Sequence, residues 1–174
     1  LHSKNFYKIY KKKNLNFILP EKFYKKLLIK AHKRKKKVGL AVCDKDTFKD
    51  LKHLNFDFYK LLSVSINNKG LINELCKKNK PIFISTGFNV KNNQIFTCLK
   101  YFKKKRGLSI LHTPMSYKIS ELNFKRILEL KRKFKIPVGY SNHNNNFNTL
   151  NLLSSYKPSS IFLYCKPSEV KGRK

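Results

Sequence analysis

Polar residues with ligand-binding or catalytic chemistry recur where short apolar runs of the sequence end. The run Ile136–Tyr140 is followed by Ser141 and His143, and then by a stretch rich in asparagine. Earlier runs end in the same way, with Lys60 and Ser63, then Ser85-Thr86-Gly87, and then His112 followed by Tyr117. A lysine neutralises a phosphate or carboxylate, and hydroxyls and backbone amides supply directed hydrogen bonds. The set is therefore suited to a small phosphorylated or carboxylated substrate.

Each of these residues also has a purely structural interpretation. Ser141 and His143 fit a surface turn of an Asn-rich protein, Lys60 fits a solvated charge, and a lone histidine such as His112 fits a satisfied position in the core. The recurrence of polar residues after four successive apolar runs favours a site.

Six apolar, strand-like runs and the segments between them must position these residues. The runs are Val38–Val42, Phe58–Val64, Pro81–Thr86, Leu108–His112, Ile136–Tyr140 and Ser160–Cys165. Apolar residues at three- and four-residue spacing predict helices over Asp46–Leu54, Gln94–Lys105 and Leu122–Phe134, and a further helix is expected to begin near Pro20-Glu21. The repeat of about 22 to 28 residues is close to one βαβ step.

Continuous apolar strands that alternate with amphipathic helices predict a parallel sheet covered by helices. Even spacing through about six strands favours a (β/α)8 TIM barrel over an open sheet. A complete barrel takes about 250 residues, so this chain would form an incomplete one. We expect a single partial-barrel domain over residues 1–174. It would comprise an irregular start and a helix (1–36), six β/α units (37–165) and a tail (166–174).

The ordered motifs at the strand ends resemble those of the sialic acid synthase (N-acetylneuraminate synthase) family. The motifs are "YKLLSVSINN", "KPIFISTGF", "ILHTPMSY", the pair Asn123-Phe124 and "VGYSNH". The corresponding motifs of the family, which these resemble, are roughly a YKI-x-S strand, KP-x-x-x-STG-M, LHC-x-S-x-YP, an NL pair and VGYSDH. Order and spacing match from about Lys37 to the end of the chain.

This resemblance implies a barrel enzyme that condenses phosphoenolpyruvate with N-acetylmannosamine or a related amino sugar to a nonulosonic acid such as sialic acid. Such a protein would be a carbon–carbon bond-forming synthase, a transferase of carbohydrate biosynthesis. In the family a divalent metal, Mn²⁺ or Mg²⁺, polarises the aldehyde of the sugar.

The resemblance also implies roles for individual residues. Ser141, with Lys60, Ser63 and Ser85, would hold phosphoenolpyruvate, Tyr117 would lie against the sugar, and His143 would be a metal ligand. No residue is assigned a catalytic role.

Several positions depart from the family pattern. The last strand of the family supplies an acidic residue and a second metal-binding histidine, and here Phe162 and Tyr164 stand in those places. One histidine alone predicts weak binding of Mn²⁺ or Mg²⁺. Other departures from the family residues are Ala41, Thr113, Met115, Lys118 and Asn142.

Parts of the family's enzymes have no counterpart in this sequence. Two strands would precede Leu1, and a small domain that donates an arginine would follow Lys174. An incomplete barrel leaves sheet edges open. The chain is therefore expected to be a fragment, to be completed by another chain or a second copy, or to be a diverged relative that is inactive alone.

The formal net charge of +31 raises a second hypothesis, a basic nucleic-acid-binding protein on a barrel-fragment scaffold. The basic runs are short and spread along the chain, which favours compositional drift toward lysine and asparagine. A barrel enzyme of another class that binds phosphorylated substrates is a third hypothesis, because a fold does not specify a chemistry.

The four cysteines and the hydropathy pattern indicate the cellular setting. Cys43, Cys76, Cys98 and Cys165 form no CxxC pair, so free thiols in a reducing compartment are expected rather than a disulfide scaffold or structural zinc. No apolar run approaches the roughly 20 residues of a membrane span, and no signal peptide is evident. We expect a soluble cytoplasmic protein.

Overall fold

The structure, a computed structural model, describes residues 19–87, 89–102, 106–144, 146 and 148–164. It divides into two compact units, Leu1–Ser109 and Ile110–Lys174, and the boundary falls within one strand. The expectation of a single domain is not tested by this division and stays a prediction. The predicted tail 166–174 and most of the predicted irregular start lie outside the described residues.

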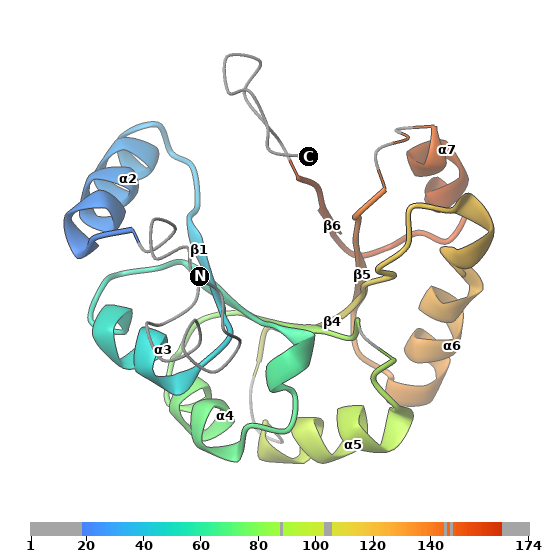
Figure 1. Cartoon of the computed structure of the whole chain (residues 1–174), viewed down its shortest axis with the longest axis horizontal. Helices are drawn as coiled ribbons and strands as arrows, with labels where there is room; N and C mark the ends of the chain where they lie inside the picture. Colours follow the sequence, from blue (N-terminus) through green and yellow to red (C-terminus); the bar gives the residue numbers. More distant parts are fainter. Residues whose placement is uncertain (1–18, 88, 103–105, 145, 147, 165–174) are drawn as a thin grey trace, which may run out of the picture. The chain divides into compact units, whose positions relative to one another are not determined.

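In the first unit, strands alternate with helices along the chain (Figure 1). The elements are α2 (Glu21–Lys33), β1 (Gly39–Val42), α3 (Lys45–Leu51), β2 (Phe58–Leu61), the 3₁₀ turn η2 (Ser63–Ser65), α4 (Lys69–Cys76), β3 (Ile82–Ser85) and α5 (Asn92–Tyr101). Strands β1, β2 and β3 are parallel neighbours, with Ala41 beside Lys60 and Lys60 beside Phe83.

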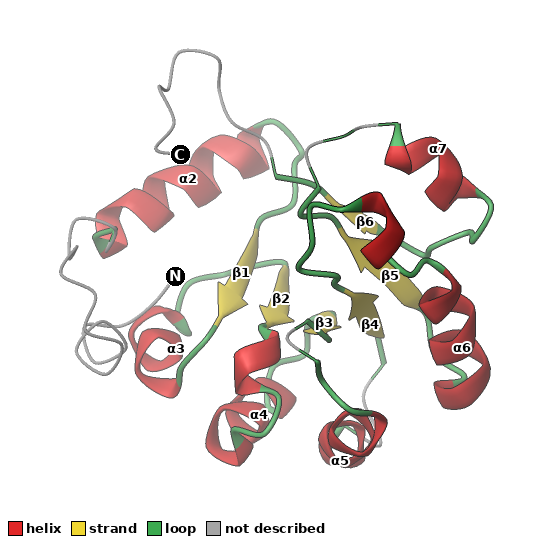
Figure 2. Ribbon diagram, turned by 45° about the vertical axis from the view of Figure 1, so that its right-hand side comes forward, coloured by secondary structure: helices red, strands yellow, loops and turns green. Residues whose placement is uncertain are grey.

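The second unit continues the same alternation (Figure 2). Its elements are β4 (Leu108–His112), η3 (Ile119–Glu121), α6 (Lys125–Phe134), β5 (Val138–Ser141), α7 (Thr149–Ser154) and β6 (Ile161–Phe162). β5 pairs in parallel with β4 on one side and with β6 on the other. Six parallel strands alternating with helices confirm the predicted fold class, an incomplete (β/α)8 barrel.

Local sequence signals set the starts and ends of the helices. The side chain of Asp44 accepts a hydrogen bond from the amide of Thr47 at 2.8 Å, and Asn68 accepts one from the amide of Leu71 at 3.0 Å; these bonds satisfy open donors at the starts of α3 and α4. Helix α6 ends where Lys135 takes a left-handed conformation with φ of 52°.

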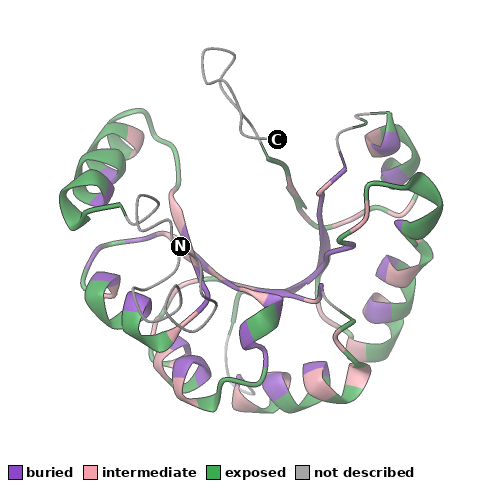
Figure 3. Cartoon of the chain, viewed as in Figure 1, coloured by how far each residue is buried: buried purple, intermediate pink, exposed green. Residues whose placement is uncertain are grey.

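The helices bury one face against the strands and leave the other exposed (Figure 3). In the first unit, Tyr59 of β2 packs edge-on against Phe48 of α3, with ring centroids 5.5 Å apart, and both side chains are almost wholly buried. In the second unit, Tyr140 of β5 is fully buried and lies 5.4 Å from the ring of Phe124. These tyrosines show which face of each strand is covered by helices.

Several predicted boundaries were wrong. The strand predicted to reach Val64 ends at Leu61, because the amides of Ser65 and Ile66 bond to carbonyls three residues back and the chain turns. The helix predicted from Leu122 begins at Lys125, since the positive φ of Asn123 (42°) interrupts it. The last strand comprises only Ile161–Phe162 of the predicted Ser160–Cys165, and Cys165 lies outside the described residues.

Two further expectations have a direct structural counterpart. Cys43, Cys76 and Cys98 are free thiols, as the absence of paired spacing predicts. Within the described ranges, no helix combines the length and the apolar character that a membrane span requires.

Candidate functional site

The first unit holds three of the predicted site residues, Lys60, Ser63 and Ser85, at the carboxyl ends of β2 and β3. Side chains alternate between the two faces of a strand. Because Tyr59 faces helix α3, Lys60 points to the face that the helices do not cover. Phe83 is the register partner of Lys60, so Ser85, two residues further along β3, lies on the same face as Lys60. The structure therefore brings Lys60 and Ser85 onto one surface.

Lys60 is the group in this cluster that an anion can reach. Ser63 and Ser85 are buried, with 7% and 3% of their surface exposed, whereas Lys60 is half-buried. Burial lowers the pKa of Lys60 to about 8, because an ammonium group loses hydration away from water. An ammonium group that is poorly hydrated gains more from a bound phosphate or carboxylate than one in bulk water.

Ser63 lies beyond the end of its strand rather than in it. It belongs to the 3₁₀ turn η2, where its carbonyl accepts a bond from the amide of Ile66. On the strand before, Ala41 is the direct register neighbour of Lys60. The predicted departure at Ala41 therefore removes a hydroxyl immediately beside this lysine.

The second unit holds the other three predicted residues: Tyr117 in the loop after β4, Ser141 at the end of β5, and His143 in the loop after β5. Ser141 is fully buried at the end of β5, on the face opposite Tyr140. His143 is two residues further on, and its ring lies 4.8 Å from the ring of Tyr164. The side chain of Tyr117 is largely exposed, at 72%.

The contact between His143 and Tyr164 bears on the expected metal site. Tyr164 packs against His143 at the position where the family resemblance predicts a second histidine. Among the described residues there is no group of three or more histidine, cysteine, aspartate or glutamate side chains that could hold a metal ion. The donor set described here does not fit a Mn²⁺ or Mg²⁺ centre, which needs several oxygen or nitrogen ligands.

His112 is a hydrogen-bonded core residue, which is the structural interpretation given for it above. Its Nε2 lies 2.8 Å from the carbonyl oxygen of Leu122, it is buried, and it packs 5.9 Å from the ring of Tyr140. Burial is the main cause that lowers its pKa, so the imidazole is neutral near pH 7. His112 therefore ties the end of β4 to the chain segment before α6.

Sequence reasoning missed a ladder of asparagines in the loop after β5. The side-chain oxygens of Asn142, Asn144 and Asn146 each accept a hydrogen bond from the backbone amide two residues on, at 3.2, 2.7 and 3.0 Å. The amide group of Asn144 also donates to the carbonyl oxygen of Tyr117 at 2.5 Å. We name these three residues the asparagine ladder. Asparagines spaced two apart are the available signal, since Asn forms such turns with its own backbone.

The ladder explains why Asn142 differs from the aspartate of the family pattern. Its side-chain oxygen accepts from the amide of Asn144, while its side-chain nitrogen donates to the carbonyl of Asn144 at 2.8 Å, and the residue is buried. An ionised aspartate cannot donate, so it would set a carboxylate oxygen against that carbonyl.

We expect Asn142→Asp to lower the free energy of unfolding by about 1 to 3 kcal/mol at pH 7, because a buried acceptor loses its donor. The loss should shrink near pH 4, where the unfavourable folded environment raises the pKa of the new carboxyl and its protonated form can donate. Urea unfolding at both pH values measures the effect. Asn146→Asp is the control, since Asn146 is exposed and a carboxylate can replace its accepting oxygen. Equal losses in the two variants would contradict the role given to the donor.

Comparison with known proteins defines first a class and then a family. The chain has the fold of a solved N-acetylneuraminic acid (sialic acid) synthetase from Leptospira borgpetersenii, with a TM-score of 0.76 and 24% identity over 83% of this chain and 51% of that chain. Residues 2–152 match the model of the NeuB family. The chain therefore belongs to the NeuB family, which confirms the resemblance drawn from its motifs.

Two curated relatives come from Campylobacter jejuni. A pseudaminic acid synthase is 30% identical over 107 residues, which cover 59% of this chain and 31% of the relative. An N,N'-diacetyllegionaminic acid synthase is 30% identical over 129 residues, covering 66% of this chain and 38% of the relative. The chain thus spans between 31% and 38% of the length of these curated relatives.

Proposed function

We propose that this chain is the phosphoenolpyruvate-binding part of a nonulosonic acid synthase. The observation that carries the proposal is the half-buried Lys60, on the uncovered face of β2 beside Ser85 and with a lowered pKa. In the proposed complex, the ammonium group of Lys60 pairs with the phosphate or carboxylate of phosphoenolpyruvate. The hydroxyls of Ser63 and Ser85, in the same unit, complete its hydrogen bonds.

The proposed reaction joins phosphoenolpyruvate to an open-chain amino sugar of the N-acetylmannosamine type. Carbon 3 of phosphoenolpyruvate forms a bond to the aldehyde carbon, water adds at carbon 2, and phosphate leaves. Tyr117 is proposed to contact the sugar. The names of the relatives support the broad reaction class, while the particular amino sugar and a cytoplasmic setting are part of the proposal.

The proposed enzyme requires further barrel units besides those of this chain. Helix α2 exposes Phe23, Leu27 and Ile29, and the region of β6 exposes Ile161 and Leu163. We propose that further barrel units, from the same polypeptide, another chain or a second copy, cover such surfaces in the working enzyme. Light scattering on the purified chain tests for a homodimer.

Calorimetric titration with phosphoenolpyruvate tests the proposed binding directly. We expect saturable binding with one site per chain, and little or no phosphate release when an amino sugar and Mn²⁺ are added to the chain alone. Absence of binding by a folded chain would overturn the proposal. Retention on DNA that falls steeply with salt would instead support the nucleic-acid hypothesis, which stays a prediction.

Replacement of Tyr164 tests whether this residue is the reason that the expected metal site lacks a second histidine ligand. We expect Tyr164→His to raise the affinity for Mn²⁺ about tenfold or more, because even residues outside the first ligand shell alter metal affinity by about 10- to 100-fold. The added imidazole would lie beside His143, as the tyrosine ring does now. Electron paramagnetic resonance of free Mn²⁺ measures the affinity. The same substitution combined with His143→Ala is the control and should show no gain; a gain there would exclude a shared ligand pair.

A further inference from the structure

An open surface pocket of about 390 Å³ lies in the first unit, between the carboxyl ends of α4 and α5. Residues Cys76–Asn79, Tyr101, Phe102 and Arg106 line it. These residues lead into the amino ends of β3 and β4, whereas Lys60 and Ser85 lie toward the carboxyl ends of β2 and β3. The cavity is therefore separate from the residues to which we assign phosphoenolpyruvate. Its volume is in the range of small-molecule sites.

The lining of this cavity, which we call the α4–α5 pocket, is cationic. Lys77, Lys78 and Arg106 line it, and none of the described residues that line it is acidic. Lysines at the end of a helix also interact favourably with its dipole, which is a structural reason for such residues. That reason does not extend to Arg106, which lies beyond the end of α5 and directly before Gly107 at the start of β4.

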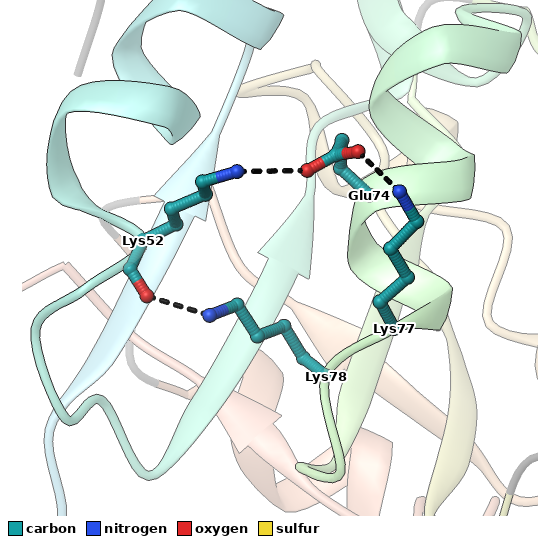
Figure 4. Close-up of polar contacts among 4 residues, drawn as sticks. All are labelled: Lys52, Glu74, Lys77 and Lys78. Carbon is teal, nitrogen blue, oxygen red and sulfur yellow. Dashed lines mark hydrogen bonds and ion pairs between the residues drawn. The ribbon is translucent and has the colours of Figure 1, made fainter.

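The carboxylate of Glu74, the partner of Lys77, is engaged by two lysines (Figure 4). Glu74 accepts from Lys52 at 3.1 Å and from Lys77 at 2.7 Å, and its hydrogen bond with Lys77 is the main cause that lowers its pKa to about 2. Glu74 is thus ionised throughout the neutral range, and it offsets only one of the surrounding positive charges. A lysine ammonium group has three donors, so the bond to Glu74 leaves Lys77 able to donate to a further anion.

A backbone contact fixes the position of the second lysine. The Nζ of Lys78 donates to the carbonyl oxygen of Lys52 at 2.6 Å and lies 6.0 Å from the ring centre of Phe48 (Figure 4). This bond crosses from the loop after α4 to the end of α3. The positive charge of Lys78 is therefore held beside α3, and the phosphate is left to Lys77 and Arg106.

The other lining groups indicate what the anion carries. The half-exposed ring of Tyr101 offers an apolar surface, and the amide of Asn79 offers both a donor and an acceptor. The planar guanidinium of Arg106 suits two oxygens of one phosphate. We propose that the α4–α5 pocket binds a small organic phosphate, with the phosphate between Lys77 and Arg106 and its sugar or base against Tyr101.

Titration of the chain with AMP, at about 0.15 M salt, tests this proposal. We expect one site, and we expect Lys77→Gln and Arg106→Gln each to weaken it about tenfold, or about 1.4 kcal/mol, since each removes a charge-assisted hydrogen bond. Lys49→Gln and Arg34→Gln are the matched controls, because both residues are exposed, lie in the same unit and remove the same charge. The controls should stay within about twofold.

Cys76 provides a readout that is local to the pocket. Its sulfur lies 3.3 Å from the carbonyl oxygen of Tyr101, while Cys43 and Cys98 are buried. AMP should slow alkylation of Cys76 by iodoacetamide, measured peptide by peptide with mass spectrometry, and the Arg106→Gln variant should lose this protection.

The results decide the proposal for the pocket, and its failure can be distinguished from failure of the proposed function. No binding of AMP at about 1 mM, equal weakening by the control variants, or binding without protection of Cys76 would overturn the proposal. Lys60→Met should leave AMP binding unchanged and weaken phosphoenolpyruvate, and Arg106→Gln should do the reverse. The pocket and the phosphoenolpyruvate site can therefore fail independently.

Discussion

Lys60→Met is expected to lower the affinity for phosphoenolpyruvate about a hundredfold. Methionine keeps an unbranched stem of similar length, so the packing against the strand face is largely preserved while the charge is lost. Removing one partner of a desolvated charge pair costs about 2 to 5 kcal/mol, and a hundredfold change corresponds to about 2.7 kcal/mol. Calorimetric titration of the wild type and the variant measures the ratio.

The pH dependence of binding tests the same residue in another way. The pKa of Lys60 is lowered to about 8, so its ammonium form is complete well below pH 8 and is lost as the pH rises through that value. Affinity in the wild type should therefore fall above about pH 8, and Lys60→Met should show no such fall. Lys49→Met is the matched control, since Lys49 is exposed on α3; a comparable loss there would mean that general charge dominates.

Lys60 should also make the stability of the ligand-free protein depend on pH. Because the pKa is about 8 in the folded chain and 10.5 without burial, the unfolded chain binds more protons between these values. The free energy of unfolding should then rise with pH over that window, relative to Lys60→Met. Urea unfolding of both proteins at pH 7.5 and pH 10 compares the slopes, and parallel slopes would contradict the assignment.

Gly139→Ala is expected to destabilise the second unit by about 3 kcal/mol. A Cβ at this position of β5 would come within 2.7 Å of the carbonyl oxygen of Ser160 and 2.8 Å of Cδ2 of Leu111. The first contact is with backbone, so no side-chain rotation relieves it and the segment before β6 must move. Overpacking in a well-packed core typically costs about 1 to 3 kcal/mol, and the backbone contact places this variant at the upper end.

Gly70→Ala is the matched substitution with the opposite expected sign. A Cβ there meets nothing closer than 3.5 Å, and the residue lies in helix α4. Alanine in a helix is favoured over glycine by about 0.5 to 1 kcal/mol, so this variant should be more stable than the wild type. Denaturant unfolding of both variants measures the difference. Equal effects in both positions would show that the close contacts at Gly139 relax without cost.

The strands and the family were accessible from sequence because their signals are local. Leu108–His112 was predicted with the bounds that β4 has, since a continuous apolar run ends there in a polar residue. The end of β2 was not predictable in this way: Val64 is apolar yet 54% exposed, and only the turn bonds of η2 show that the chain has left the strand. Periodicity cannot distinguish an exposed apolar residue from the next strand position.

The site was accessible only in part, because burial and partners depend on tertiary structure. The order of Lys60 and Ser85 along the chain indicated strand ends, and the register then placed both on one face. That Ser141 would be fully buried could not be read from its neighbours in sequence. The bond from Asn144 to Tyr117 spans 27 residues, so no local pattern could reveal it.

In the loop after β5, the residues that hold the backbone alternate with a residue that presents its side chain. Asn142, Asn144 and Asn146 hold the backbone, and His143 stands between two of them with its ring directed to Tyr164. Substitution at an even position changes the shape of the loop, whereas substitution at position 143 changes the chemistry presented on an unchanged frame. Such a loop can exchange the side chain at position 143 in one step, without a simultaneous repair of the fold.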